Sequence, residues 1–153
     1  CIRDRYAEAT QSDAKKVGIK INLKNVDYNV LDGIGVRGEY DLLISNILTE
    51  QAGDPEVFVN QYWKTNVDGS NPQNGSGYSN PEYDALSDQL ASEFDPAKRR
   101  DIIIKMEKIV QDDAATLIFG YPQTNMVSNK SVQNANIYPC DYYWVTKDIT
   151  PAK

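Results

Sequence analysis

Apolar residues recur every three or four positions through the middle of the chain, a spacing typical of helices that bury one face. The stripe of the second such segment comprises Ile102, Ile103, Met106, Ile109 and Val110. Each segment follows a start signal, a capping side chain before a proline: Asn80 with Pro81, and Asp95 with Pro96. The pattern predicts two successive amphipathic helices that pack on a larger body.

Helices and strands are predicted to alternate along the rest of the chain. Further helices are predicted over residues 3–17, 28–34 and 55–63, and strands over residues 19–24, 40–48, 116–121 and 125–128. Residues 64–79 are rich in Asn, Gly and Ser and predict a loop, which at this length is usually functional or mobile. Residues 129–153 show no clear period. The order predicts an α/β fold, a mixed sheet with flanking helices.

Length and charge limit the possible classes of protein. The chain has 153 residues, enough for one domain that buries about 70% of its unfolded surface. Its 22 acidic and 16 basic residues leave a net charge of −6, which argues against a nucleic-acid partner. No apolar run approaches the roughly 20 residues of a membrane span, and no signal peptide is visible.

The side-chain inventory argues against catalysis. The chain has no histidine, which excludes a Ser-His-Asp triad, a Cys-His pair and a histidine-based zinc site. Cys1 and Cys140 alone cannot form a thiolate zinc site, and one pair at the chain ends makes no disulfide framework. Asp112 and Asp113 are adjacent in a helix and do not face each other as a hydrolytic pair would. We therefore expect no catalytic residue, no metal site and no cofactor.

A glycine-rich stretch, Gly33, Gly35 and Gly38, resembles a nucleotide-binding loop only superficially. Its spacing is imperfect and it does not directly follow a predicted strand. It is interpreted as a turn.

The order of short sequence motifs in and around the two predicted amphipathic helices is a more specific signal than composition or periodicity. GYSNPEYD at 77–84, ASEFDPAKRR at 91–100 and MEKIVQDDA at 106–114 closely resemble the C-terminal lobe of family 5 extracellular solute-binding proteins. AKKVGIKI at 14–21, EYDLLI at 39–44 and GDP at 53–55 extend the resemblance upstream. It covers residues 6–128 well and the tail less closely. Members of this family serve ABC importers of peptides, nickel chelates and related solutes.

The resemblance implies a single lobe of a periplasmic-binding-protein-like (type II) fold. Residues 1–128 would form the ligand-binding lobe, and residues 129–153 a tail that returns to a missing N-terminal lobe. The chain would then be a fragment of a protein in the periplasm or at the cell surface, lipid-anchored through the missing N-terminus. Its partners would be the missing lobe, a small-molecule or peptide solute, and the membrane subunits of an ABC permease.

Ligands of open α/β sheets collect beyond the carboxyl ends of strands, and residues 48–54 follow the predicted strand 40–48. By resemblance, this segment faces the cleft between lobes. The predicted ligand-binding residues are Leu48, Thr49, Glu50, Gln51, Asn74 and Tyr78. Peptide-binding members usually carry tryptophan and aspartate where this chain has Leu48 and Gln51. Asp54 is interpreted as a helix cap before Pro55.

The identity of the solute stays open between a peptide-like molecule and a nickel chelate. Residues 126–128 and 149–153 resemble the nickel-binding branch, yet the chain lacks the histidine of that branch. Nickel would then arrive chelated, and the protein would contact the chelator. The alternative from another class is a free-standing module whose exposed aromatic residues bind a protein or glycan: Tyr62, Trp63, Tyr142, Tyr143 and Trp144.

Overall fold

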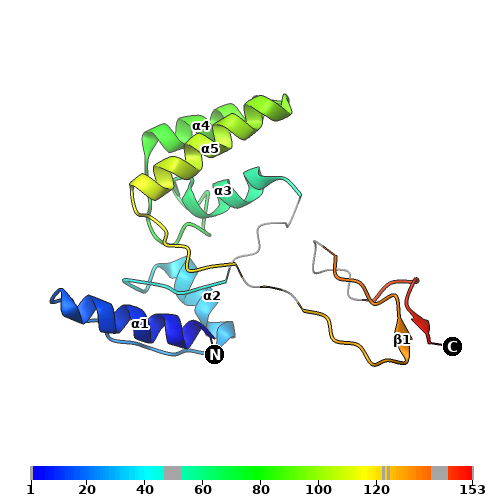
Figure 1. Ribbon diagram of the computed structural model, residues 1–153. Helices are drawn as coiled ribbons and strands as arrows, with labels where there is room; N and C mark the ends of the chain where they lie inside the picture. Colours follow the sequence, from blue (N-terminus) through cyan, green and yellow to red (C-terminus); the bar gives the residue numbers. More distant parts are fainter. Residues whose placement is uncertain (1, 47–52, 122, 124, 139–144, 153) are drawn as a thin grey trace. The chain divides into compact units, whose positions relative to one another are not determined.

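The computed structural model describes residues 2–46, 53–121, 123, 125–138 and 145–152. The helices are α1 (Ile2–Lys16), α2 (Tyr28–Arg37), α3 (Pro55–Trp63), α4 (Pro81–Ser92) and α5 (Pro96–Asp112), and the strands are β1 (Val132–Gln133) and β2 (Thr150–Pro151) (Figure 1). The chain divides into two compact units, Cys1–Leu117 and Ile118–Lys153. The predicted solute-contacting residues Leu48, Thr49, Glu50 and Gln51 lie outside the described residues.

The predicted starts of α3, α4 and α5 are confirmed, because each begins with a proline behind a capping side chain. Asn80 accepts hydrogen bonds from the backbone N–H groups of Glu82 (2.9 Å) and Tyr83 (3.2 Å). Asp95 accepts two bonds in the same way. Asp54 accepts one from the N–H of Glu56 at 2.9 Å and is the predicted cap of α3. These local signals act within one turn of the chain.

The first two helices also form where predicted. The helix predicted to end at Gly18 ends at Lys16, and Gly18 has φ 83°. The second, predicted over 28–34, continues to Arg37 because Gly38 takes the left-handed conformation that closes a helix (φ 63°). The interpretation of the glycine stretch as a turn is therefore wrong in part, since Gly33 and Gly35 lie inside α2 and only Gly38 ends it.

A buried core joins α3, α4 and α5, and α4 and α5 lie side by side (Figure 1). Its members are Val59, Trp63, Tyr83, Leu90, Ile102, Met106 and Val110. The Tyr83 hydroxyl donates to the carbonyl of Val59 at 2.7 Å, and the Trp63 Nε1–H donates to the Thr116 hydroxyl at 3.0 Å. The buried side chains of α5 belong to the predicted stripe. Trp63, named above as an exposed recognition aromatic, is a core residue instead.

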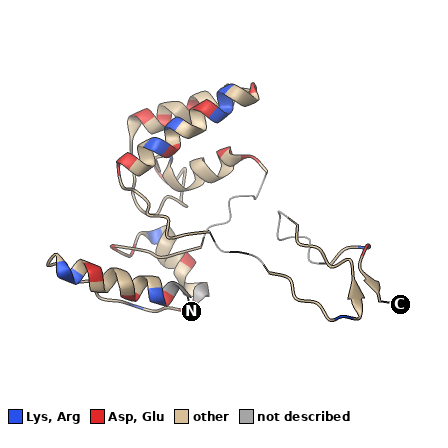
Figure 2. Cartoon of the chain, viewed as in Figure 1, with Lys and Arg blue, Asp and Glu red and all other residues tan. Residues whose placement is uncertain are grey.

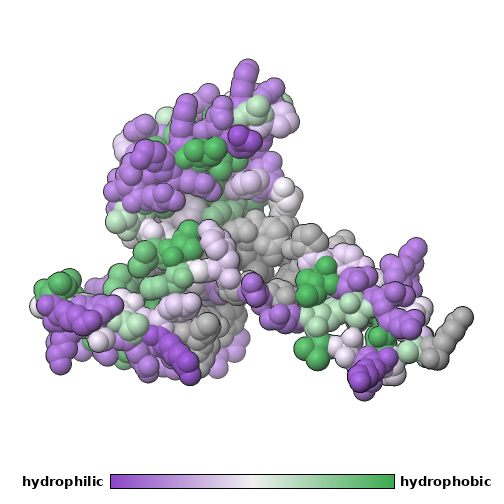
Figure 3. All heavy atoms as spheres, viewed as in Figure 1, coloured by the Kyte–Doolittle hydropathy of each residue, from purple (hydrophilic) through white to green (hydrophobic). Residues whose placement is uncertain are grey.

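The predicted strands do not form in the described parts of residues 19–24, 40–48, 116–121 and 125–128, and this expectation is corrected. Two short strands pair antiparallel within the tail, Val132 opposite Pro151 and Gln133 opposite Thr150. The apolar segments predicted as strands instead leave side chains exposed, such as Leu42 (72%) and Ile118 (58%). Figure 3 shows such apolar, green atoms at the surface. A buried strand needs neighbouring strands that pair with its backbone N–H and C=O groups, and other elements that cover both of its faces.

Candidate functional site

Of the predicted site residues, the structure describes Asn74 and Tyr78, which lie in the loop between α3 and α4. Asn74 is only 3% exposed. Its amide nitrogen donates to the carbonyls of Lys64 (3.0 Å) and Tyr78 (2.8 Å), and its amide oxygen accepts from the Ser76 hydroxyl (2.8 Å). Both amide hydrogens are therefore used inside the loop. Asn74 ties the start of the loop to its end.

Asn71 supports the same loop from its other side. Its amide nitrogen donates to the carbonyls of Asn60 (2.9 Å) and Lys64 (2.7 Å), at the end of α3. The carbonyl of Asn60 also accepts the backbone N–H of Lys64 at 3.3 Å, and the carbonyl of Lys64 also accepts from Asn74, so Asn71 adds a second donor to each. The Asn-rich composition that predicted a loop thus also gives the loop a defined shape.

Tyr78 connects the end of this loop to the C-terminus of α5. Its hydroxyl donates to Asp113 Oδ2 at 2.6 Å, and the Asn80 amide donates to the same oxygen at 2.9 Å. Burial, followed by the neighbouring Asp113 carboxylate, raises the pKa of Tyr78, so the phenol stays protonated. The hydrogen bonds from Tyr78 and then Asn80 lower the pKa of Asp113. At neutral pH a neutral donor therefore faces a charged acceptor.

A shallow, open depression of about 340 Å³ borders the first part of the loop. The residues that line it all have polar side chains: Asn60, Gln61, Lys64, Thr65, Ser70 and Asn71. The Lys64 ammonium is paired with Asp88 at 2.7 Å. Such a surface can form hydrogen bonds with a small polar group, but it does not enclose one.

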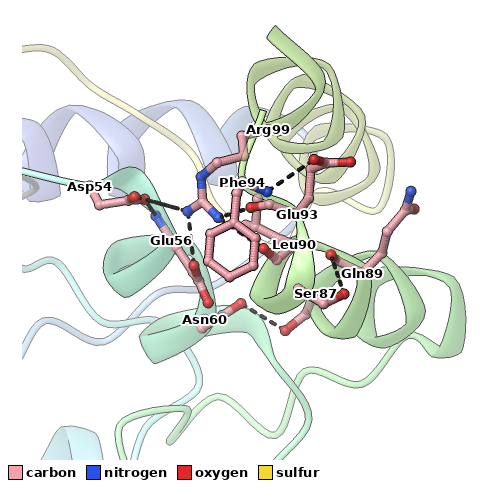
Figure 4. A network of polar contacts seen from close by, with 10 residues as sticks. Asp54, Glu56, Asn60, Ser87, Gln89, Leu90, Glu93, Phe94 and Arg99 are labelled. Atoms are coloured by element: carbon pink, nitrogen blue, oxygen red, sulfur yellow. Dashed lines mark hydrogen bonds and ion pairs between the residues drawn. The ribbon is translucent and has the colours of Figure 1, made fainter. Parts of the chain in front are cut away.

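A polar network around Arg99 holds the start of α3 against the turn between α4 and α5 (Figure 4). Arg99 Nη2 donates to both Asp54 oxygens (3.0 and 2.9 Å) and to Glu56 Oε2 (2.9 Å). Arg99 Nη1 donates to the carbonyls of Leu90 (2.9 Å) and Glu93 (2.8 Å). The guanidinium thus makes five hydrogen bonds, and the Arg99 side chain is 18% exposed.

The charge of Asp54 is stabilised from two directions. The N–H of Glu56 contributes most to lowering the pKa of the Asp54 carboxyl, and the Arg99 guanidinium lowers it further.

Sequence reasoning missed Arg99 because it lies in a run of basic residues, Lys98, Arg99 and Arg100, that looks uniformly solvated. Figure 2 shows basic and acidic residues interspersed on α4 and α5, so charge alone does not single it out.

The described residues hold neither a cluster of metal-binding side chains nor a membrane-spanning helix. Among these residues, no group of three or more His, Cys, Asp or Glu side chains is placed to hold a metal ion. In the same part of the chain, no helix combines the length and the apolar character that crossing a membrane requires.

Known proteins that resemble this chain share a role in solute binding. No protein-family profile matches the chain. The probable D,D-dipeptide-binding periplasmic protein DdpA of Escherichia coli is 33% identical over 128 residues, 83% of this chain and 24% of DdpA. The nickel-binding protein NikA of Staphylococcus aureus is 29% identical over 141 residues, 92% of this chain and 28% of NikA. The chain thus spans about a quarter of the length of these relatives.

A solved structure supports the same relationship. The crystal structure of Staphylococcus aureus NikA in complex with Ni(L-His)2 matches with a TM-score of 0.63 and 30% sequence identity. The match covers 72% of this chain and 23% of that structure. The predicted fold class is therefore confirmed in part: the structural relatives are periplasmic-binding-protein-like substrate-binding proteins, whereas the sheet found among the described residues has only two short strands.

Proposed function

We propose that this chain, whose homologues are family 5 extracellular solute-binding proteins, forms one wall of the solute site in the binding component of an ABC importer. The observation that carries the proposal is the similarity to DdpA and NikA over most of this chain. In such a role the protein captures a solute and performs no chemistry. Two lobes would close around the solute by a hinge motion, and the closed form would deliver it to a permease.

The solute would be peptide-like or a nickel chelate. One relative is named for D,D-dipeptides, and another was crystallised with Ni(L-His)2. With no histidine in the chain, this wall would bind nickel through its chelator. Nickel would therefore be cargo, and no resident cofactor is proposed.

The proposed contacts come from two parts of the chain. Leu48, Thr49, Glu50 and Gln51 would contact the solute directly. Asn74 and Tyr78 would bound the site from the loop between α3 and α4. Because both amide hydrogens of Asn74 are donated within that loop, its contribution would be to hold the loop in shape.

The proposed setting follows from the relatives as well. DdpA is named as a periplasmic protein. We propose an extracytoplasmic location, lipid anchoring through a preceding segment, and three partners: the permease membrane subunits, the solute and an N-terminal lobe. The tail 129–153 would contact that lobe. The free-standing interaction module has less support, because Trp63 is buried. Its other predicted aromatic contacts Tyr142, Tyr143 and Trp144 lie outside the described residues.

A thermal-shift screen tests the proposal. The full-length gene product and the 153-residue chain are each heated with dipeptides, tripeptides, Ni(II) alone, and Ni(II) with L-histidine. Ligands that bind the folded protein raise its Tm in proportion to RT ln(1 + [L]/Kd). We expect a shift in the full-length protein with peptides or with nickel-histidine and a weaker one in the short chain. No shift with any of these solutes would refute the proposal, and an equal shift in the short chain would favour a self-sufficient module.

A further inference from the structure

We propose that the contact of Gly75 with Gly35 and Gly38, which we call the glycine joint, is the point at which the chain opens in part. When the joint separates, residues 2–46, which include α1 and α2, move away from the core of α3, α4 and α5 while that core stays folded. The inference concerns a motion within this chain and does not depend on the proposed solute.

The glycine joint brings two backbones into direct contact. A Cβ atom on Gly75 would overlap the carbonyl oxygen of Gly35, and a Cβ atom on Gly38 would lie 2.5 Å from the carbonyl oxygen of Gly75. The obstructing atoms belong to the backbone, so no side-chain rotation can move them aside. A side chain at position 75 is therefore incompatible with the closed joint.

Gly75 is required by this contact and not by its own backbone conformation. It is not among the glycines with positive φ, unlike Gly77 two residues later. Residues with a side chain can adopt a negative φ without strain. A substitution at Gly75 therefore acts on the joint and leaves the local backbone conformation of the loop accessible.

Residues before position 47 share no buried side chains with the core. None of the side chains whose exposure is described in residues 4–46 is buried, and the partly buried apolar residues that pack on the core begin at Phe58. The described hydrogen bonds of residues 7–46 stay within the first 46 residues, such as that from Gln11 to the carbonyl of Ile21 at 2.8 Å. Among the described residues, this stretch thus meets the core-bearing part through backbone contact at the joint.

Each side of the joint keeps its own shape. On the core side, the buried Asn74 side chain fixes the backbone next to Gly75 through two hydrogen bonds to carbonyls of the loop. On the other side, α2 closes its own end, because the N–H of Gly38 donates to the carbonyl of Gly35 at 3.2 Å. Regions with few buried contacts open at a lower free energy than the whole protein unfolds. Opening therefore separates two preformed surfaces.

Hydrogen exchange of the 153-residue chain tests whether residues 2–46 open separately. Ile102→Val removes one methyl group from the buried core and should lower the protection of the α5 amides about fivefold. The protection of the α2 amides should not change, because the opening that exposes them leaves the core intact. Equal losses of protection in α2 and α5 would mean that the two parts unfold together, and would overturn the proposal.

A variant of the joint tests whether Gly75 determines the closed form. Gly75→Ala places a methyl group against the Gly35 carbonyl and should lower the protection of the α2 amides about tenfold, the effect of an overpacked contact. Protection in α5 should fall by no more than that factor, because both openings start from the same closed form. Gln73→Ala, at an exposed position of the same loop, should change neither.

The outcomes of the joint variant are also decisive. Unchanged protection of α2 in Gly75→Ala would overturn the proposal, since α2 would then exchange by fraying of its own ends. If Gly75→Ala does not fold, the Ile102→Val comparison decides: loss of protection confined to α5 supports separate opening, and equal loss in α2 refutes it.

Discussion

Replacing Asn74 by aspartate tests whether the loop between α3 and α4 is held by the amide of Asn74. The change is nearly isosteric, but it turns a donor into an acceptor. The new oxygen would face the carbonyls of Lys64 and Tyr78, to which Asn74 now donates at 3.0 and 2.8 Å. The site is 3% exposed, so water cannot readily compensate.

The expected magnitude follows from these contacts. Two lost hydrogen bonds cost about 2 kcal/mol together. At pH 8 a buried carboxylate opposite two carbonyl oxygens adds about 2 kcal/mol more, because its pKa in the folded state rises by one to two units at about 1.4 kcal/mol each. Relative to wild type, the stability of the variant should therefore be greatest below about pH 4, near the unfolded pKa, and should fall as pH rises through the folded-state pKa.

The assay is urea unfolding of Asn74→Asp and of wild type at pH 4, 6 and 8. The matched control is Gln73→Glu, which makes the same change of charge at an exposed position next to it. We expect a loss of about 4 kcal/mol for Asn74→Asp at pH 8, about 2 kcal/mol at pH 4, and less than about 0.5 kcal/mol for the control. Equal losses for the two variants, or a loss for Asn74→Asp that shrinks as pH rises, would refute the reasoning.

Two further predictions concern the helical core and the link between Tyr78 and α5. Leu90→Ala removes a fully buried side chain and should lower the free energy of unfolding, measured in urea, by about 3 to 4 kcal/mol. Phe94→Ala, at an 86% exposed position, should lower it by less than about 0.5 kcal/mol. Similar losses for the two variants would contradict the described core. Tyr78→Phe removes the largest cause of the lowered Asp113 pKa, so NMR titration should find that pKa closer to its ordinary value. Since a lowered carboxyl pKa contributes stability above the unfolded value and loses it as pH falls through the folded value, wild type should lose more stability than Tyr78→Phe on acidification below about pH 4. An Asp113 pKa identical in the two proteins would argue against the hydrogen bond.

The elements that were predicted correctly depend on neighbours within a few residues. Asn80 with Pro81 and Asp95 with Pro96 begin their helices because the capping acceptors and the prolines act within one turn. The buried stripe of α5 was predictable for the same reason, since Ile102, Met106 and Val110 follow the helical period. Local chemistry decides these features.

The elements that were predicted wrongly depend on partners far along the chain. The segment 40–48 has the apolar content of a buried strand, but a strand requires another strand beside it, and periodicity does not reveal whether one is present. Arg99 posed a related difficulty. Arg99 and Arg100 have the same side chain and differ only in the direction in which it leaves the helix. The partners of Arg99, Asp54 and Glu56, lie more than forty positions earlier in the sequence. Trp63 was misjudged as exposed because its burial depends on α5 and Thr116.

The hydrogen bonds of Asn74 have a consequence for the chemical ageing of the protein. Asn74 is followed by Gly75, and in flexible chains the glycine nitrogen of such a pair readily attacks the asparagine side-chain carbonyl, with release of ammonia and formation of a succinimide that hydrolyses to aspartate or isoaspartate. The attack requires the side chain to turn toward its own backbone. While its amide is held by the carbonyls of Lys64 and Tyr78, that rotation is blocked. Conversion at position 74 would therefore record how often the loop has opened during the lifetime of the molecule.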